Sequence, residues 1–261
     1  MPQPPTPGTR LTPSPGPLPV PAAGERKARP ATPLTRRYEI TALTAGGRPR
    51  EFTTVAPASP DFEAAFGAFA RGTLINTPDG PVAVEDITPG EMIETAEEGA
   101  KPLLWKGAMT IFPDMPDVAR RPVALTRITA EAFGIGRPTP DLVLGPWARL
   151  ALRQAAFRAE VGCEQAMVPA SALADDSGVL ALRPVTPLRL YHLCLHGQQT
   201  IRANGLEAES FHPGDGAEMV MDRGSVGLFL DLFPHADRLA DFGPMQRPRL
   251  SAFEYERASA A

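Results

Sequence analysis

The sequence predicts an all-β domain built from many short strands. Short apolar and β-branched runs alternate with turn signals along most of the 261 residues. The chain contains 31 prolines and 23 glycines, which disfavour long helices and mark turns. Segments with helical periodicity are few. Together these three observations favour a compact all-β domain.

The first 36 residues have a different character from the rest. Residues 1–36 contain 11 prolines and no sustained hydrophobic period. Such a segment buries too little apolar surface to offset the entropy of ordering it, so we expect a disordered Pro-rich arm. Its alternating prolines at 13–21 would fit an aromatic groove of an unknown protein partner, whereas a solvated tail is the simpler interpretation.

Regular structure is expected to begin near Arg37. Residues 38–43 and 50–55 have strand patterns and flank Gly46-Gly47, which predicts a hairpin. Ser59-Pro60 then predicts a helical turn, because serine is a common N-cap and proline suits the first helical position. Residues 37–65 are therefore interpreted as a β-hairpin and a short helical lead-in.

Further strands are expected wherever an apolar run meets a turn signal. They are predicted at residues 72–75, 82–84, 92–95, 102–107, 109–112, 123–125, 141–144, 167–170, 189–195 and 200–203. A short helix is expected within 150–157, broken helix within 217–232 and irregular structure over 236–242. Residues 215–261 thus form a short, partly helical tail.

Charge and hydropathy exclude several classes of function. The formal net charge is -4, and six basic residues lie in 1–37, so the remainder is acidic and a poor match for nucleic acid. No apolar run approaches the roughly 18 residues needed to span a bilayer, so no membrane partner is expected. The N-terminus lacks a basic segment followed by an apolar run. We therefore expect a cytoplasmic protein, with export by a signal-independent route left open.

Cysteines and histidines give no sign of a metal or cofactor site. Cys163 and Cys194 are too few for a disulfide framework and lack metal-site spacing, and the chain has four histidines. No phosphate loop, dinucleotide fingerprint or triad motif is present. The sequence therefore predicts no cofactor and no metal.

A series of short motifs runs through residues 66–214. In chain order they are Phe69-x-x-Gly72-Thr73, Thr77-Pro78-x-Gly80-x-x-x-Val84-Glu85-Asp86-Ile87-x-Pro89-Gly90, Pro102-Leu103-x-Trp105-x-Gly107, Asp141-Leu142-Val143-Leu144-Gly145-Pro146-Trp147-Ala148-Arg149-Leu150, Val168-Pro169-Ala170-x-x-Leu173, Tyr191-His192-Leu193 and Ala203-Asn204-Gly205-Leu206-x-x-Glu209-Ser210-Phe211-His212-Pro213-Gly214. In this order they resemble bacterial Hint (hedgehog/intein-type) domains. The resemblance implies the Hint fold, whose bent strands form two pseudo-symmetric halves around a central cleft.

The resemblance also implies which positions carry chemistry. In Hint domains a cysteine at the position of Ala68 attacks the preceding carbonyl, and a histidine at the position of Ala148 protonates the departing amine. A second histidine stands at the position of Gln198. All three side chains here lack the required group, so we expect a Hint domain that has lost self-cleavage and acts as a binding or structural module.

The alternative is a divergent autoprocessing domain that uses Cys194 or water, since some inteins begin with alanine and use another nucleophile. His192, Cys194 and His196 would share one face of a strand, because side chains alternate. The opposing interpretation is a buried cysteine beside histidines satisfied by hydrogen bonds. A third hypothesis is that the Pro-rich arm carries the function and the β-domain presents it.

Four other features are interpreted as structural. Cys163 is expected to be a structural or partly exposed thiol, and His212 lies at the closing edge of the domain. Asn204-Gly205 favours a tight hairpin turn over succinimide formation. Asp175-Asp176 favours a turn.

Overall fold

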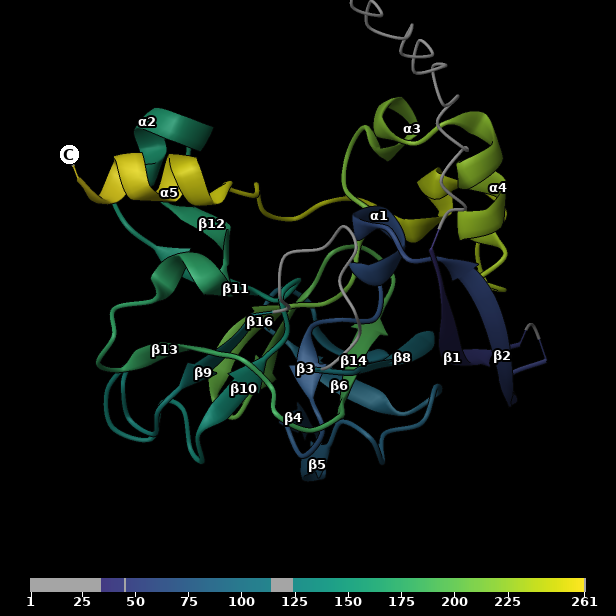
Figure 1. Ribbon diagram of the computed structural model, residues 1–261, viewed down its shortest axis with the longest axis horizontal. Coiled ribbons are helices and arrows are strands. Elements are labelled where there is room, and N and C mark those ends of the chain that lie inside the picture. Colours follow the sequence, from purple (N-terminus) through teal and green to yellow (C-terminus); the bar gives the residue numbers. More distant parts are fainter. Residues whose placement is uncertain (1–33, 45, 114–123, 261) are drawn as a thin grey trace, which may run out of the picture. The chain divides into compact units, whose positions relative to one another are not determined.

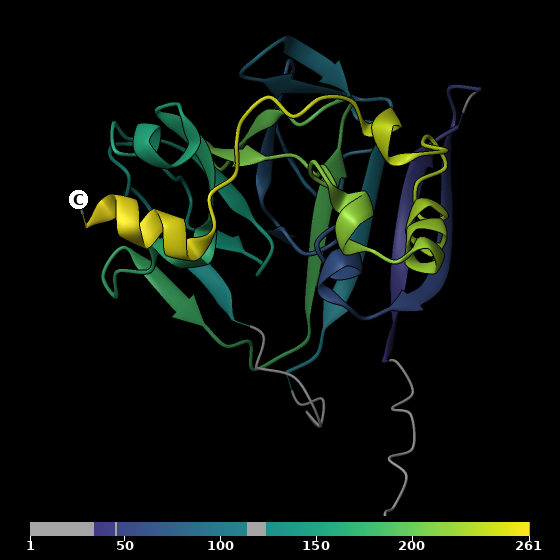
Figure 2. The ribbon, with the colours of Figure 1, turned by 90° about the horizontal axis from the view of Figure 1, so that it is seen from above.

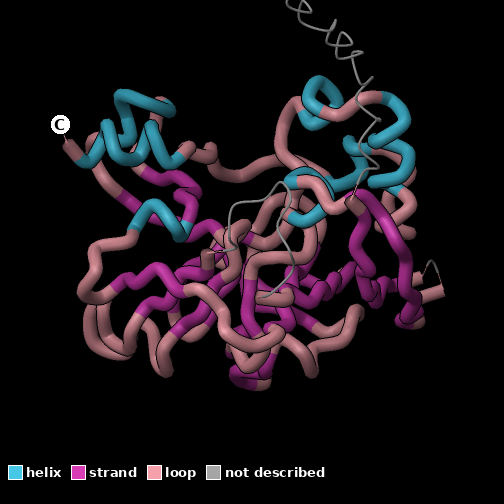
Figure 3. Tube along the Cα trace, viewed as in Figure 1, coloured by secondary structure: helices cyan, strands magenta, loops and turns pink. Residues whose placement is uncertain are grey.

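The computed structural model describes residues 34–44, 46–113 and 124–260. In these ranges the chain forms two antiparallel sheets with a few short helices beside them (Figure 1; Figure 3). The all-β prediction is confirmed. The predicted arm of residues 1–36 lies outside the described residues except at its end, where the first strand already begins at Thr35.

The first sheet contains the N-terminal hairpin, the long central strands and the strand that begins at Phe69, which is called the motif strand below. Its order is β13 (Val179–Leu182), β9 (Leu125–Ile128), β10 (Leu142–Leu144), β3 (Phe69–Ala70), β14 (Leu188–Cys194), β8 (Trp105–Ile111), β1 (Thr35–Leu43) and β2 (Pro49–Pro57). Strand β14 lies in the middle, pairing with β3 on one side and β8 on the other. This arrangement places the motif strand β3 directly beside the predicted histidine and cysteine candidates.

The second sheet carries the strands of the later motifs. Its order is β12 (Gln165–Pro169), β11 (Arg149–Arg153), β16 (Leu206–Glu209), β15 (Thr200–Ala203), β4 (Leu74–Thr77) and β5 (Gly80–Ala83), and β6 (Met92–Thr95) joins β15 to β7 (Gly99–Pro102). Asn204-Gly205 forms the β15–β16 turn with positive φ at both residues, which suits a two-residue hairpin. The predicted turn is confirmed.

The predicted hairpin and helical lead-in are both present. Strands β1 and β2 pair from Thr35 opposite Pro57 to Leu43 opposite Pro49. Helix α1 (Pro60–Glu63) follows with Ser59 as its N-cap residue, although the serine side chain makes no capping hydrogen bond. Proline at the first helical position therefore sets this start more than the serine does.

Short helices lie beside the two sheets (Figure 1). They are α2 (Phe157–Val161), α3 (Ala217–Val220), α4 (Arg223–Leu230) and α5 (Ala252–Ser259), with 3-10 turns at Ala170–Leu173 and Leu239–Phe242. The expected broken helix within 217–232 is confirmed as α3 and α4. The segment after the second 3-10 turn crosses to α5, which lies beside α2 (Figure 2).

An aromatic cluster joins the C-terminal tail to the first sheet. The Trp105 ring of β8 packs against Phe233 in a tilted arrangement with ring centroids 4.6 Å apart, and its indole N–H donates to the carbonyl of Leu232 at 2.7 Å. Phe211 stacks on Phe233 and contacts Phe229 of α4. The tail is thus part of the core, because its large aromatic side chains are buried with those of the sheet.

The helix predicted within 150–157 is wrong. Residues 149–153 form strand β11, in which Leu150 pairs with Val168 on one side and Ala208 on the other. Helix α2 begins only at Phe157. Pairing on both sides satisfies the backbone of this segment more fully than one helical turn could.

Several smaller boundaries also differ from expectation. Strands β7, β13 and β16 and helix α5 were not predicted. The strand expected at 123–125 is β9, which begins at Leu125, and residue 123 lies outside the described residues. No helix in the described ranges has the length and apolar character needed to cross a bilayer.

Candidate functional site

The peptide bond before Ala68 is held by main-chain hydrogen bonds. The Ala68 N–H donates to the carbonyl of Tyr191 at 3.1 Å, and its own carbonyl accepts from Gly145 N at 2.7 Å. The Gly67 carbonyl accepts from the main-chain N–H of Trp147 at 3.3 Å. Ala68 itself is buried. The nucleophile position of the motif is therefore fixed between β14 and the 145–147 loop, and it presents a methyl group.

Glycine allows the two segments to approach this closely. A Cβ at Gly145 would lie 2.1 Å from the Gly67 carbonyl oxygen and 2.7 Å from Leu190 Cδ1. A Cβ at Gly67 would lie 2.6 Å from Cδ1 of the Trp147 ring. The indole therefore covers Gly67, and neither position has space for a side chain.

Ala148, for which the family resemblance implies a histidine, lines a pocket of about 630 Å³. The wall is mostly apolar and includes Phe211 and Phe229. Its polar side chains are Asp61, Arg149, His192, Glu209, His212, Asp215 and Arg249. A pocket of this size and composition is typical of small-ligand sites. Ala148 leaves open the space that a larger side chain would occupy.

Of the candidate residues His192, Cys194 and His196, only His192 lines this pocket. Its Nδ1 lies 2.8 Å from the Ala64 carbonyl oxygen, which can only accept a hydrogen bond, so the ring proton lies on Nδ1 and Nε2 carries the free lone pair. Nε2 has no hydrogen-bond partner among the described residues. Burial lowers the pKa of His192 to about 4, although the Ala64 carbonyl and the charge and carbonyl of Glu209 act in the opposite direction. The ring is therefore neutral at pH 7.

Glu209 is the buried carboxylate at the pocket, and two arginines share it. Arg249 Nε donates to Glu209 Oε1 at 2.8 Å, and Arg149 Nε lies 3.7 Å from Oε2. The guanidiniums also donate to main-chain carbonyls, Arg149 to Leu250 and Arg249 to His212. Burial lowers the pKa of Arg149 while Glu209 raises it. One carboxylate thus faces two cations.

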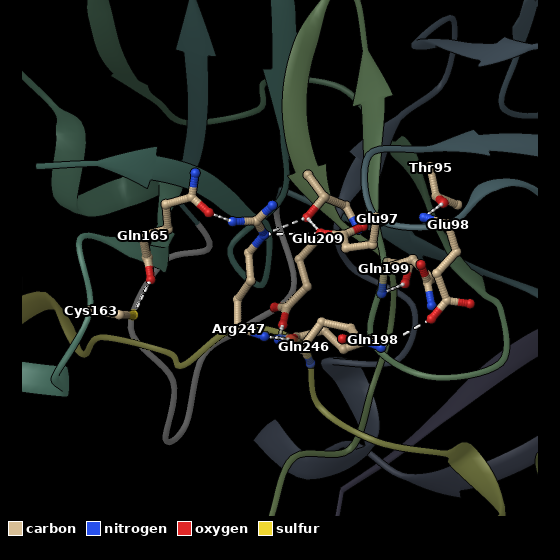
Figure 4. A network of polar contacts seen from close by, with 12 residues as sticks. Thr95, Glu97, Glu98, Cys163, Gln165, Gln198, Gln199, Glu209, Gln246 and Arg247 are labelled. Carbon is tan, nitrogen blue, oxygen red and sulfur yellow. Dashed lines mark hydrogen bonds and ion pairs between the residues drawn. The ribbon is translucent and has the colours of Figure 1, made fainter.

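Gln198, for which the family resemblance implies a second histidine, is buried, and both ends of its side-chain amide make hydrogen bonds. Its side-chain N–H donates to Glu209, and its carbonyl oxygen accepts from the main-chain N–H groups of Gln246 at 3.0 Å and Arg247 at 2.7 Å. Figure 4 shows this network, in which Arg247 continues to Glu97 and Gln165. The amide therefore ties the C-terminal segment to the pocket.

The structure does not bring His192, Cys194 and His196 together at one site. Cys194 is completely buried in the aromatic cluster, with its Sγ 3.8 Å from His235 Nε2. Burial raises the pKa of its thiol. His196 follows the end of β14 and is exposed. Of the three, only His192 reaches the pocket.

The features interpreted as structural have structural surroundings. His212 donates from Nε2 to the Gly243 carbonyl and accepts at Nδ1 from Gly214 N, and burial lowers its pKa. Asp175 Oδ1 accepts three main-chain N–H bonds from residues 177–179, which forms the expected turn. Cys163 is partly exposed and donates to the Gln165 carbonyl. Among the described residues, no group of three or more His, Cys, Asp or Glu side chains could hold a metal ion.

Sequence reasoning missed the charged residues of the pocket. Arg149 and Glu209 lie inside the family motifs, so their place beside Ala148 and Ser210 was a usable signal. Trp147 lies in the same motif as Arg149 and carried the same signal. Arg249 carried none, because its role depends on a contact with Glu209, 40 residues away in the chain.

The β-rich fold with a motif strand held at its centre defines a Hint-type domain. A family model of the Hint domain matches residues 67–215, and the chain belongs to this family. The bacterial intein-like domain from Clostridium thermocellum is similar at 16% identity, over 56% of this chain and 99% of that chain, with a TM-score of 0.38. The MchDnaB-1 intein is similar at 13% identity, over 55% of this chain and 100% of that chain, with a TM-score of 0.33. A comparison with curated proteins finds no match.

Proposed function

We propose that this Hint domain does not cleave its own chain at the Gly67–Ala68 bond and instead serves as a binding module. The observation that carries the proposal is the methyl group of Ala68 at the nucleophile position, buried and held by main-chain bonds to Tyr191 and Gly145. Attack on the Gly67 carbonyl requires a thiol or hydroxyl at that place. Ala148 removes the proton donor for the departing amine as well.

The geometry argues against Cys194 as a replacement nucleophile. A cysteine attacks as the thiolate, and burial keeps this thiol protonated by raising its pKa. The side chain is enclosed with Trp105 and contacts His235, whereas Ala148 and His192 line the pocket. Its surroundings support the structural interpretation of Cys194.

Water is the other nucleophile of the alternative hypothesis, and His192 is the group that would activate it. The neutral ring with an open Nε2 has the protonation state of a general base. This route would still lack a donor for the leaving amine at Ala148. Comparing the wild-type chain with a His192 variant therefore tests whether the chain is cleaved slowly by hydrolysis.

Intact-mass analysis tests the proposal. Purified wild-type chain, incubated at pH 7 with a thiol or hydroxylamine, is expected to keep its full-length mass. The Ala68→Cys/Ala148→His double variant is the matched comparison, because it restores both groups without changing Gln198. Two fragments of the wild-type chain that meet at Gly67–Ala68 would overturn the proposal. If the His192→Asn variant then gave no fragments, the cleavage would be assigned to water activated by His192.

A further inference from the structure

Two buried polar atoms at the pocket are left without partners. His192 Nε2 is an acceptor, because its ring proton lies on Nδ1, and Trp147 Nε1 is a donor. Both atoms lack a hydrogen-bond partner in the part of the chain that the structure describes. A buried polar group without a partner is energetically unfavourable. A ligand that offers one donor and one acceptor would satisfy both.

The charges that meet at the buried carboxylate of Glu209 are unbalanced, because two partly buried arginines face it. Arg149 and Arg249 share the single carboxylate of Glu209, which also accepts from Gln198. Two further acids of the lining, Asp61 and Asp215, are exposed, so water screens their charge. The two histidines of the lining, His192 and His212, have lowered pKa values and stay neutral. The interior therefore carries a surplus positive charge that favours an anionic ligand.

The remaining wall suits an apolar group. Phe211 and Phe229 contribute aromatic rings, and Ala148, Pro146 and Met221 contribute small or flexible apolar surface. The volume of about 630 Å³ accommodates one amino-acid residue with a large side chain. The pocket thus combines an anion preference, one donor, one acceptor and an apolar wall.

We propose that the pocket binds the carboxy-terminal residue of a polypeptide, with an apolar or aromatic side chain. Its α-carboxylate pairs with Arg149 and Arg249 and accepts from the Trp147 indole, its amide N–H donates to His192 Nε2, and its side chain packs on the phenylalanines. An internal peptide segment lacks the negative charge, and a free amino acid adds an ammonium group next to two guanidiniums. This inference rests on the proposed binding function and names its ligand class.

Titration with a minimal ligand tests this inference. The probe is N-acetyl-L-phenylalanine, added to the full-length chain and followed by calorimetry or by NMR shifts. We expect saturable binding that weakens with added salt. N-acetyl-L-phenylalanine amide removes the charge and 3-phenylpropionate removes the amide N–H. Each is expected to bind about tenfold more weakly or worse, since a hydrogen bond to a charged or buried group is lost.

Variants assign the binding to this pocket. Arg149→Gln is expected to weaken binding about tenfold or more. Trp147→Phe keeps an aromatic ring over Gly67 and removes the indole N–H. This variant tests the same pocket if Arg149→Gln does not fold. Arg202→Gln changes an exposed arginine on β15 and is the matched control, with unchanged affinity expected.

Equal binding of the acid and its amide, or wild-type affinity in both pocket variants, would overturn the ligand assignment. Absence of saturation at millimolar concentrations of the acid would overturn it too. Intact mass, measured on the same samples, keeps the two proposals separate. A chain that stays whole but does not bind contradicts only the ligand class, whereas a chain that cleaves contradicts the proposed function.

Discussion

Replacing Gly145 by alanine tests how closely the 145–147 loop is packed on the Gly67–Ala68 peptide. The added Cβ would lie 2.1 Å from the Gly67 carbonyl oxygen and 2.8 Å from the Gly67 carbonyl carbon. Both are main-chain atoms, so no side-chain rotation can relieve the contact. The loop must move away from the motif strand.

The cost follows from what that movement breaks. It separates Gly145 N from Ala68 O, now at 2.7 Å, and Trp147 N from Gly67 O, now at 3.3 Å. Each hydrogen bond contributes about 1 kcal/mol, and overpacking adds about 1–3 kcal/mol. We expect the free energy of unfolding to fall by about 3–5 kcal/mol, a large part of the total for an ordinary domain.

Urea unfolding, followed by tryptophan fluorescence, measures this loss. With a slope of about 2 kcal/mol per M, the midpoint is expected to fall by about 1.5 M or more. Gly227→Ala is the matched control, because a methyl group added to this helical glycine would have nothing within 4 Å and should raise stability by up to about 1 kcal/mol. A Gly145→Ala midpoint within experimental error of wild type would refute the close-packing argument.

Two further predictions concern pH and the C-terminal segment. The pKa of His192 is about 4 in the folded chain against about 6.5 unfolded, so the unfolded chain takes up the proton first as pH falls. Stability should therefore be full above about pH 6.5 and fall towards pH 4. Urea midpoints at pH 7.5 and 5 measure this dependence, which His192→Asn should reduce while His235, also lowered to about 4, preserves part of it. An equally steep dependence in His192→Asn would contradict the assignment. Gln198→His should speed hydrogen exchange at the main-chain amides of Gln246 and Arg247, because a neutral imidazole has one acceptor lone pair for two N–H groups. Unchanged exchange protection at both amides would show that the Gln198 hydrogen bonds are dispensable.

Local turn chemistry explains how much of the fold could be predicted. Asn204-Gly205 and the pair Gly46-Gly47 mark hairpins whose strands lie next to each other in sequence. The series of short motifs through residues 66–214, taken in order, likewise indicated the family. These features depend on a few adjacent residues, which is the range over which a single sequence is informative.

Contacts between distant segments explain the failures. Leu150 lies in a strand because Val168 and Ala208 supply backbone partners on both sides, and the local pattern gives no sign of either partner. Arg249 enters the pocket only because the tail passes Glu209. The predicted face of His192, Cys194 and His196 required the strand to continue to residue 196, whereas β14 ends at Cys194. The pattern could not show where the strand ends.

The three substituted positions are therefore not equivalent. Under the proposed function, Ala68 and Ala148 each offer a methyl group where the family resemblance implies a reactive side chain. Gln198 instead makes bonds that a histidine could not reproduce, since it joins Glu209 to the main chain at Gln246 and Arg247. That segment lies beyond residues 67–215, the part matched by the family model. Under the proposed function, a histidine at position 198 would remove this anchor, so the resemblance's second histidine and the bonded C-terminal segment exclude each other at this position.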